Sequence, residues 1–120
     1  MSAKNDRVVC VVDDDEAVRD SICVLLQSEG IAARAYGSAA EFLLDKDALS
    51  SGCFIFDVHM PLMDGIALLR IVRGKGVTVP VYLLTGRADA VIKRAALAAG
   101  ATAVLNKPYA ELLDLIRGVL

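Results

Sequence analysis

Residues suited to holding or receiving a phosphoryl group stand at the ends of four of the five short apolar runs in this chain. They are Asp13 with Asp14, then Asp57, Thr85 and Lys107. If these runs are strands of one parallel sheet, their carboxyl ends share one edge, and open α/β sheets place their ligand sites at that edge. Three carboxylates, a hydroxyl and an ammonium group would then converge at one place.

Three carboxylates at close range raise one another's pKa unless a cation lies between them. Mg²⁺ suits such a site, because it takes one or two carboxylates, retains waters and accepts phosphate oxygens in its remaining positions. The acidic run Asp13-Asp14-Asp15-Glu16, taken alone, fits an acid-rich helix N-terminus equally well. Asp57 and Lys107 at the same edge favour a metal site.

The run of three aspartates leaves a register question of one residue. The preceding apolar run ends at Val12, which favours Asp13 and Asp14 as the metal pair and leaves Asp15 at the start of the following helix.

Asp57 follows an apolar run and precedes a turn at 58–61. A carboxylate held there can attack a phosphoryl donor and form an aspartyl phosphate. Lys107 would balance the acids and later contact one phosphoryl oxygen, and Thr85 would donate a hydrogen bond to another. Each alone fits a blander interpretation, an ordinary strand-end threonine or a solvated lysine. Lys107-Pro108 is also an X-Pro bond at a tight turn, where a cis form would aim the lysine.

The remaining sequence alternates strand-like runs with helical periodicity, in the order (βα)5. We expect strands at 8–12, 31–36, 53–57, 79–84 and about 102–106. We expect helices at 16–29, from a Ser38/Glu41 capping box, from Asp64 to the glycines at 74 and 76, at about 88–99 and after Pro108. This order predicts one α/β domain over 1–120, a doubly wound parallel sheet with the flavodoxin-like order 2-1-3-4-5. The helix at 88–99 is rich in alanine and should be held more loosely than the others.

Composition excludes several function classes. The chain has 120 residues, 56% of them hydrophobic and 23% charged, with a net charge of −2 and no basic stripe, so direct binding of nucleic acid is not expected. Cys10, Cys23 and Cys53 stand singly in apolar stretches, without the spacing of a zinc site, and indicate buried thiols in a reducing cytoplasm. No apolar stretch approaches the length of a membrane span, so no membrane association is expected.

The segment from Asp57 to Gly65, DVHMPLMDG, resembles the phosphoacceptor signature of bacterial two-component response-regulator receiver domains. Three further motifs follow the family order, so the resemblance covers essentially the whole chain: Val12-Asp13-Asp14, Leu84-Thr85-Gly86 and Asn106-Lys107-Pro108. The sequence around Arg19, Thr85-Gly86-Arg87 and Lys107-Pro108 is similar to that of nitrogen-fixation-type regulators with helix-turn-helix outputs.

The resemblance implies a role for each residue at the expected sheet edge. Asp57 would accept phosphate from a sensor histidine kinase or from acetyl phosphate. Asp13, Asp14, Asp57 and the backbone carbonyl of His59 would hold Mg²⁺, and Thr85 and Lys107 would contact the phosphoryl group. The product would be a signalling state rather than a turned-over substrate. It would act on a C-terminal DNA-binding domain, on a protein target, or through a homodimer formed by helix 4, strand 5 and helix 5.

One position departs from the family pattern. Receivers usually carry Tyr or Phe three residues before the lysine, with a ring that moves inward on phosphorylation, and here Val104 stands there. We therefore expect phosphorylation to shift the loop after Thr85 and the alanine-rich helix by a different mechanism or with smaller amplitude. His59 and Arg87 should rim the pocket and control the access of hydrolytic water.

Two alternatives remain. A degenerate receiver, acting as a phosphorylation-independent binding module, is favoured by Val104 alone. A haloacid-dehalogenase-type phosphatase also uses an aspartyl phosphate, but it needs an Asp where His59 stands and a cap domain for which this chain has no room.

Overall fold

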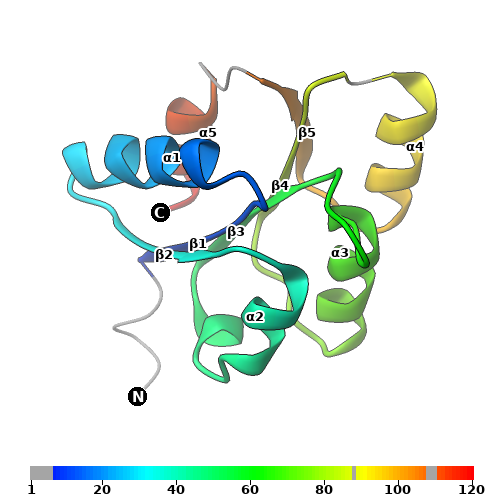
Figure 1. Ribbon diagram of the computed structural model, residues 1–120, viewed down its shortest axis with the longest axis horizontal. Coiled ribbons are helices and arrows are strands. Elements are labelled where there is room, and N and C mark those ends of the chain that lie inside the picture. Colours follow the sequence, from blue (N-terminus) through cyan, green and yellow to red (C-terminus); the bar gives the residue numbers. More distant parts are fainter. Residues whose placement is uncertain (1–6, 88, 108–110) are drawn as a thin grey trace.

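In the computed structural model, the chain forms a five-stranded parallel sheet with helices on both faces (Figure 1). The structure describes residues 7–87, 89–107 and 111–120. The strands are β1 (Val8–Val12), β2 (Ala32–Tyr36), β3 (Cys53–Asp57), β4 (Val81–Thr85) and β5 (Ala103–Asn106). The helices are α1 (Glu16–Ser28), α2 (Ala39–Leu44), the 3₁₀ turn η2 (Ala48–Ser50), α3 (Gly65–Gly74), α4 (Ala90–Ala98) and α5 (Leu112–Val119). Their order across the sheet is β2-β1-β3-β4-β5, which confirms the predicted fold.

The three inner strands are buried along their whole length. Helices cover both faces of the sheet, so these strands are continuous apolar runs without polar alternation. The expected edge position of the second strand is also confirmed, because β2 pairs with β1 alone and exposes Ala32 and Ala35. β4 begins later than predicted. Pro80 has no N–H to donate to a neighbouring strand, although its carbonyl accepts from Phe54 N–H at 3.0 Å.

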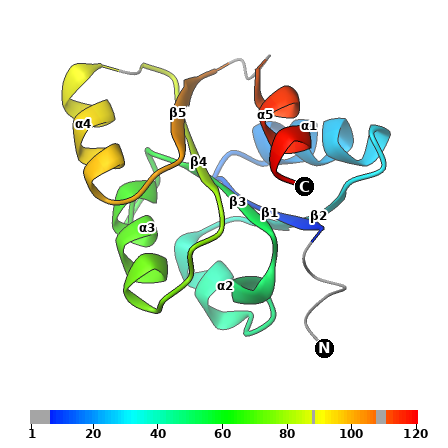
Figure 2. The same ribbon diagram turned by 180° about the vertical axis from the view of Figure 1, so that it is seen from behind.

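Two apolar cores lie on opposite faces of the sheet. On one face α1 and α5 pack through Ile22, Leu26, Leu112 and Ile116. On the other, α2, α3 and α4 pack through Phe42, Leu68, Leu69, Val72 and Ala96. Figure 2, the view from behind, shows the same division, with α1 and α5 together and away from α3 and α4. The helices thus fix the sheet from both sides and leave the strand ends to carry polar groups.

Side-chain caps begin α2 and α3 at the two residues where the sequence predicted them. Asp64 accepts from Ala67 N–H at 2.8 Å, and Ser38 accepts from Glu41 N–H at 3.1 Å. The capping box is shifted by one residue, because the Glu41 carboxylate accepts from Gly37 N–H, 2.7 Å away, instead of from Ser38. The Glu41 side chain therefore binds the backbone of the residue that precedes the N-cap.

The alanine-rich helix α4 buries one side chain fully, that of Ala96. Its cap is Asp89, which accepts from Ile92 N–H at 2.8 Å. Gly100 follows the helix with a φ of +103°, a conformation suited to glycine. The packing of α4 is thus shallow, and the expectation that this helix is held more loosely than the others stays a prediction.

The fourth helix begins at Ala90, after its Asp89 cap, and not at about 88 as expected. Residue 88 itself and the Lys107–Pro108 bond lie outside the described residues. Among the residues that the structure describes, no helix is both long enough and apolar enough to cross a bilayer.

Candidate phosphoryl-transfer site

Asp13 and Asp57 leave the sheet side by side. Asp13 follows β1 directly, Asp57 is the last residue of β3, and the register of these neighbouring strands pairs Val12 with Phe56. The N–H of Asp13 donates to the Tyr36 carbonyl at 3.1 Å, which extends the hydrogen bonding of β2 and β1 by one residue. The sheet therefore positions both carboxylates at its carboxyl edge.

The three predicted metal acids form one cluster. One carboxylate oxygen each of Asp13, Asp14 and Asp57 lies within 4.8 Å of the other two. Asp13 and Asp57 are buried and Asp14 is exposed, which is the arrangement of a site open on one side. Clustered oxygen donors of this kind fit Mg²⁺, which keeps several waters and uses few protein ligands.

Asp15 has a different task from the two aspartates before it. Its carboxylate caps α1 and accepts from Ala17 N–H at 3.0 Å and from Val18 N–H at 3.3 Å. A carboxylate that caps a helix is not free to turn toward the sheet edge. The structure thus supports the register in which Asp13 and Asp14 are the metal pair.

Lys107 lies between the two buried acids. Its Nζ is 3.4 Å from Asp13 Oδ2 and 3.4 Å from Asp57 Oδ1. Burial alone would lower the pKa of Lys107, but the charges of Asp13 and Asp57 and their hydrogen bonds outweigh it, so the pKa is raised. Lys107 is therefore charged at neutral pH and balances part of the acid cluster.

Asp57 is 5% exposed, and the pKa of its carboxyl group is raised from 3.8 to about 6. Burial is the larger cause and the charge of Asp13 is the second. Lys107 and a hydrogen bond from the backbone N–H of His59 act in the opposite direction and do not fully offset them. Asp57 is thus an ionised carboxylate at neutral pH, in an environment that favours its loss of charge.

Thr85 connects the site to the loop that leads toward α4. It is fully buried at the end of β4, and its Oγ1 accepts from Arg87 N–H at 3.2 Å. Its carbonyl accepts from the N–H of Lys107 at 2.9 Å. Any movement of the Thr85 hydroxyl therefore changes the support of the Arg87 backbone.

Gly65 lets α3 begin directly against Asp57. A Cβ at this position would lie 2.3 Å from the Asp57 carbonyl oxygen, closer than a real Cβ approaches any atom. The N–H of Gly65 also donates to the Val58 carbonyl at 3.0 Å. The final glycine of the DVHMPLMDG segment is thus required by this close approach.

His59 and Arg87 are both exposed. That placement is compatible with the expected rim of the pocket, and their effect on hydrolytic water stays a prediction. Val104 is partly buried and packs against the core on the α3 and α4 side.

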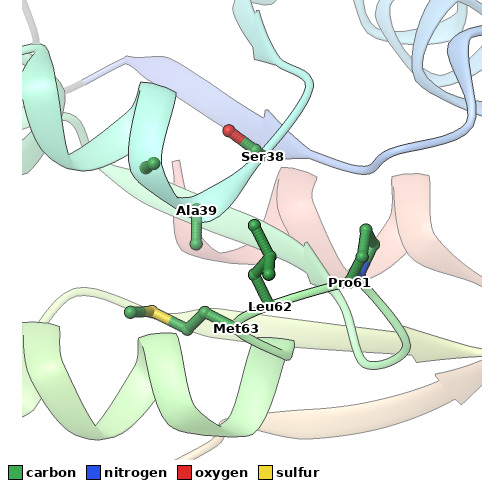
Figure 3. A pocket seen from close by; sticks show the side chains of 6 residues that line it. Ser38, Ala39, Pro61, Leu62 and Met63 are labelled. Atoms are coloured by element: carbon green, nitrogen blue, oxygen red, sulfur yellow. The ribbon is translucent and has the colours of Figure 1, made fainter.

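The loop at 58–64, between β3 and α3, also borders an apolar hollow of about 210 Å³, shown in Figure 3. Its lining residues are Ser38, Ala39, Ala40, Pro61, Leu62 and Met63. None of these is acidic or basic, so the hollow is separate from the acid cluster.

Arg19 contacts the site although its sequence pattern did not indicate a role there. Its Nη1 donates to the main-chain carbonyl of Asp13 at 2.9 Å. The signal available in the sequence is a basic residue six positions after the first acid, on the helix that the acidic run begins. Helical spacing alone does not predict which carbonyl such a long side chain reaches.

Comparison with known proteins identifies the family. Residues 9–117 match the family model described as "Response regulator receiver domain". The chain belongs to this family. As a receiver domain of two-component response regulators it is a signalling domain, as the resemblance implied.

Individual relatives agree with this assignment. The transcriptional regulatory protein FixJ of Azorhizobium caulinodans is 40% identical over 84% of this chain and 48% of the relative. The response regulator protein TmoT of Ectopseudomonas mendocina is 36% identical over 96% of this chain and 53% of the relative. The receiver chain thus spans about half the length of these curated relatives, whose names describe regulators.

Solved structures show the same fold. The receiver domain of the Francisella response regulator 1452 superimposes with a TM-score of 0.87 at 27% identity, covering 94% of this chain and 95% of that one. The chain described as FixJ-N has a TM-score of 0.79 at 31% identity, covering 90% and 86%. The receiver assignment therefore rests on sequence and on fold independently.

Proposed function

We propose that this receiver domain is a phosphoacceptor, in which Asp57 takes a phosphoryl group from a sensor histidine kinase or from acetyl phosphate. The observation that carries the proposal is the buried Asp57 carboxylate, which lies beside the Asp13 and Asp14 acids and 3.4 Å from the Lys107 ammonium group. Family membership supports the same role.

The transfer is a substitution at phosphorus. A carboxylate oxygen of Asp57 forms the new P–O bond while the P–N bond of a phosphohistidine breaks, and its electron pair stays on the imidazole nitrogen. In acetyl phosphate the P–O bond to the acyl group breaks and acetate leaves. Positioning and charge supply most of the rate enhancement in such reactions.

The protein groups around Asp57 have distinct parts in this step. Lys107 stays charged and contacts a phosphoryl oxygen, and the Thr85 hydroxyl donates a hydrogen bond to another. Asp13, Asp14, Asp57 and the backbone carbonyl of His59 would hold Mg²⁺. When bound, this ion supplies positive charge beside the phosphoryl oxygens.

The output of the phosphorylated domain is a change of partner. We propose that residues 1–120 act as one receiver unit in the cytoplasm, without turnover of a substrate and without binding nucleic acid or a membrane directly. The relatives are named as transcriptional regulators, which supports a DNA-binding output domain or protein target. A homodimer through α4, β5 and α5 is the other route.

One observation favours a second candidate function. Val104 replaces the aromatic ring on which receivers of this family rely, as a phosphorylation-independent binding module would allow. The complete set of acids with Thr85 and Lys107 supports the phosphoacceptor more strongly. The phosphatase alternative is not supported, because His59 stands at the position of its second aspartate.

Intact-mass measurement tests the proposal. Incubation with acetyl phosphate and Mg²⁺ should add one phosphoryl group to the wild-type chain and none to Asp57→Asn. Asp47→Asn, at an exposed site away from the sheet edge, is the matched control and should gain the group as the wild type does. No mass gain in the wild type, or an undiminished gain in Asp57→Asn, would contradict it.

A further inference from the structure

We infer that Arg19 is a positioning residue of the acid cluster: it holds the peptide unit between Asp13 and Asp14 and thereby sets where the Asp14 carboxylate stands. This inference rests on the proposed Mg²⁺-dependent function. Arg19 belongs to the second turn of α1 and is half-buried. Its Nη1 donates to the Asp13 carbonyl at 2.9 Å.

The three acids differ in how they are held. The Asp13 carboxylate is fixed at both oxygens, because Oδ1 accepts from Asp15 N–H at 2.9 Å and Oδ2 from Lys107 Nζ at 3.4 Å. Asp57 is held by Lys107 and by the backbone N–H of His59. Two of the three members therefore have their own supports within the site.

The third member, Asp14, depends on its backbone. Its side chain is exposed, and within residues 7–87, 89–107 and 111–120 no hydrogen bond to its carboxylate is recorded. The peptide unit that joins Asp13 to Asp14 is held, within the described residues, by the hydrogen bond that Arg19 donates to the Asp13 carbonyl. Rotation of this peptide unit would move the Asp14 carboxylate relative to the other two.

The shape of the slot around the Arg19 guanidinium suits arginine. A Cβ at Gly37 would lie 3.2 Å from Arg19 Nη1 and 2.8 Å from Glu41 Oε2. The guanidinium therefore lies against the Gly37 backbone on one side and the Asp13 carbonyl on another. A planar group with several donors fits such a slot better than the single ammonium group of lysine.

A displaced Asp14 matters because Mg²⁺ demands near-ideal octahedral geometry. Groups that orient metal ligands typically change metal affinity by about 10–100-fold when removed. Arg19 does not contact Asp57 or Lys107 through any hydrogen bond recorded among the described residues. Its loss should therefore weaken Mg²⁺ binding and leave the reactivity at saturating Mg²⁺ close to that of the wild type.

The experiment compares Arg19→Met and Arg19→Lys with Arg70→Met, which removes an exposed arginine from α3. Calorimetric titration of the unphosphorylated proteins with Mg²⁺ should show Kd raised about 10-fold or more in Arg19→Met, an intermediate value in Arg19→Lys and no change in the control. With acetyl phosphate, the Mg²⁺ concentration for half-maximal phosphorylation should rise by the same factor, while the rate at saturation stays within about twofold.

A fourth variant keeps the inference testable if Arg19→Met does not fold. Gly37→Ala leaves Arg19 in place but narrows its slot from the side of Nη1, so it should also raise the Mg²⁺ Kd, by a smaller factor. Urea unfolding in EDTA establishes that each variant is folded under the titration conditions.

The outcomes separate this inference from the proposed function. Wild-type Mg²⁺ affinity in Arg19→Met, or in a folded Gly37→Ala when Arg19→Met is unfolded, overturns the role of Arg19, even if the wild type accepts phosphate. Mg²⁺ binding without any mass gain in the wild type overturns the phosphoacceptor proposal and leaves the Arg19 result valid. A wild type that binds no Mg²⁺ overturns both.

Discussion

Asp57 is placed under two opposing requirements by its surroundings. As the proposed nucleophile it must be ionised, but burial and the neighbouring Asp13 raise its pKa to about 6. The nearby Lys107 prevents a larger shift by offering a charge at 3.4 Å. The result is a carboxylate that is charged at neutral pH yet poorly stabilised, and neutralisation by a cation or by a covalent bond relieves that cost.

The raised pKa predicts a pH-dependent stability difference between the wild type and Asp57→Asn. The folded state holds the Asp57 proton more tightly than the unfolded chain does, so the stabilising contribution is complete below pH 4. It is lost as the pH rises from 3.8, the ordinary pKa of an aspartate, to about 6. A shift of this size corresponds to about 3 kcal/mol at pH 7.

Without metal, Asp57→Asn should therefore be more stable than the wild type at pH 7.5, by up to about 3 kcal/mol. The difference should shrink toward pH 4. Urea unfolding in EDTA at several pH values measures it, with Asp47→Asn as the control for the substitution itself. A difference that is independent of pH would show that the ionisation of Asp57 does not oppose folding.

Leu62 has unfavourable backbone geometry. Its φ is +69°, and its side chain is fully exposed, at 109% of the reference value. The left-handed region costs a residue with a Cβ roughly 1–2 kcal/mol. Glycine removes that cost but loses more chain entropy on folding.

Leu62→Gly should accordingly raise the free energy of unfolding by up to about 1 kcal/mol, since the side chain that is removed is fully exposed. The control is Leu44→Gly, at a residue that is 82% exposed at the end of α2 with no positive φ. That substitution should lower the stability by about 0.5–1 kcal/mol. Urea denaturation compares the two, and equal losses in both variants would refute the strain at Leu62.

At the scale of the elements, the sequence predicted most of the sheet because burial and chemistry change together at the strand ends. Asp13 and Asp57 each follow an uninterrupted apolar run, and such a change is visible without any tertiary information. Helix starts were predictable for the same reason at Asp64 and Ser38, where a short polar side chain precedes an apolar face. The start of β4 was displaced because Pro80 lacks an N–H.

The contacts of the long side chains could not be predicted. Which carbonyl Arg19 reaches depends on where the β1–α1 turn lies relative to the start of α2, and neither position follows from local pattern. The positive φ of Leu62 was hidden for a related reason, since it lies in a turn closed by the hydrogen bond from Met63 N–H to the Pro61 carbonyl at 2.8 Å, which no local pattern indicated. Residue types therefore indicated the candidate site, and tertiary structure was needed for its supports.

Arg73 shows how one side chain can join three elements. From α3 it donates to the carbonyls of Val77 at 2.9 Å and Val79 at 2.7 Å, before β4. It also donates twice to the Gly100 carbonyl, at 3.2 and 2.8 Å, just after α4. The C-terminal end of the weakly packed α4 is thus fastened to α3.

Arg73→Met should lower the free energy of unfolding by about 1–3 kcal/mol, because three carbonyls lose their donor. Arg70→Met on the exposed face of the same helix should change it by less than about 0.5 kcal/mol. Urea denaturation gives both values, and hydrogen exchange should show faster opening of α4 in Arg73→Met alone. Unchanged protection in α4 would mean that Arg73 does not fasten this helix.

Over the whole molecule, Val104 stands where an aromatic ring would couple the site to the surface. The contact that joins the site to the segment before α4 is the hydrogen bond from Arg87 N–H to Thr85 Oγ1, at 3.2 Å. If the Thr85 hydroxyl turns toward a bound phosphoryl group, this support is lost just before α4. The other end of α4 is held by Arg73, which donates to the Gly100 carbonyl. We therefore expect the N-terminal end of the helix to move.

The surface that would respond carries apolar side chains. On α4, Val91 is 71% and Leu97 58% exposed, and this helix packs beside β5. If the activated domain pairs through α4, β5 and α5, these side chains should become buried in the dimer. Light scattering after size exclusion, with beryllofluoride and Mg²⁺ as the phosphoryl mimic, should then show a dimer that is absent without them.

Leu97→Asp places a charge in that interface and should weaken the activated dimer at least about tenfold, because an unpaired charge is costly to bury. The matched control is Leu44→Asp on α2, at an exposed residue (82%) of a helix outside the proposed interface, and its dimer should match the wild type. Both variants must still gain a phosphoryl group from acetyl phosphate, since neither lies at the acid cluster. Equal weakening in the two variants would move the interface away from α4, and a wild type that stays monomeric would leave an output domain or protein target as the route of the signal.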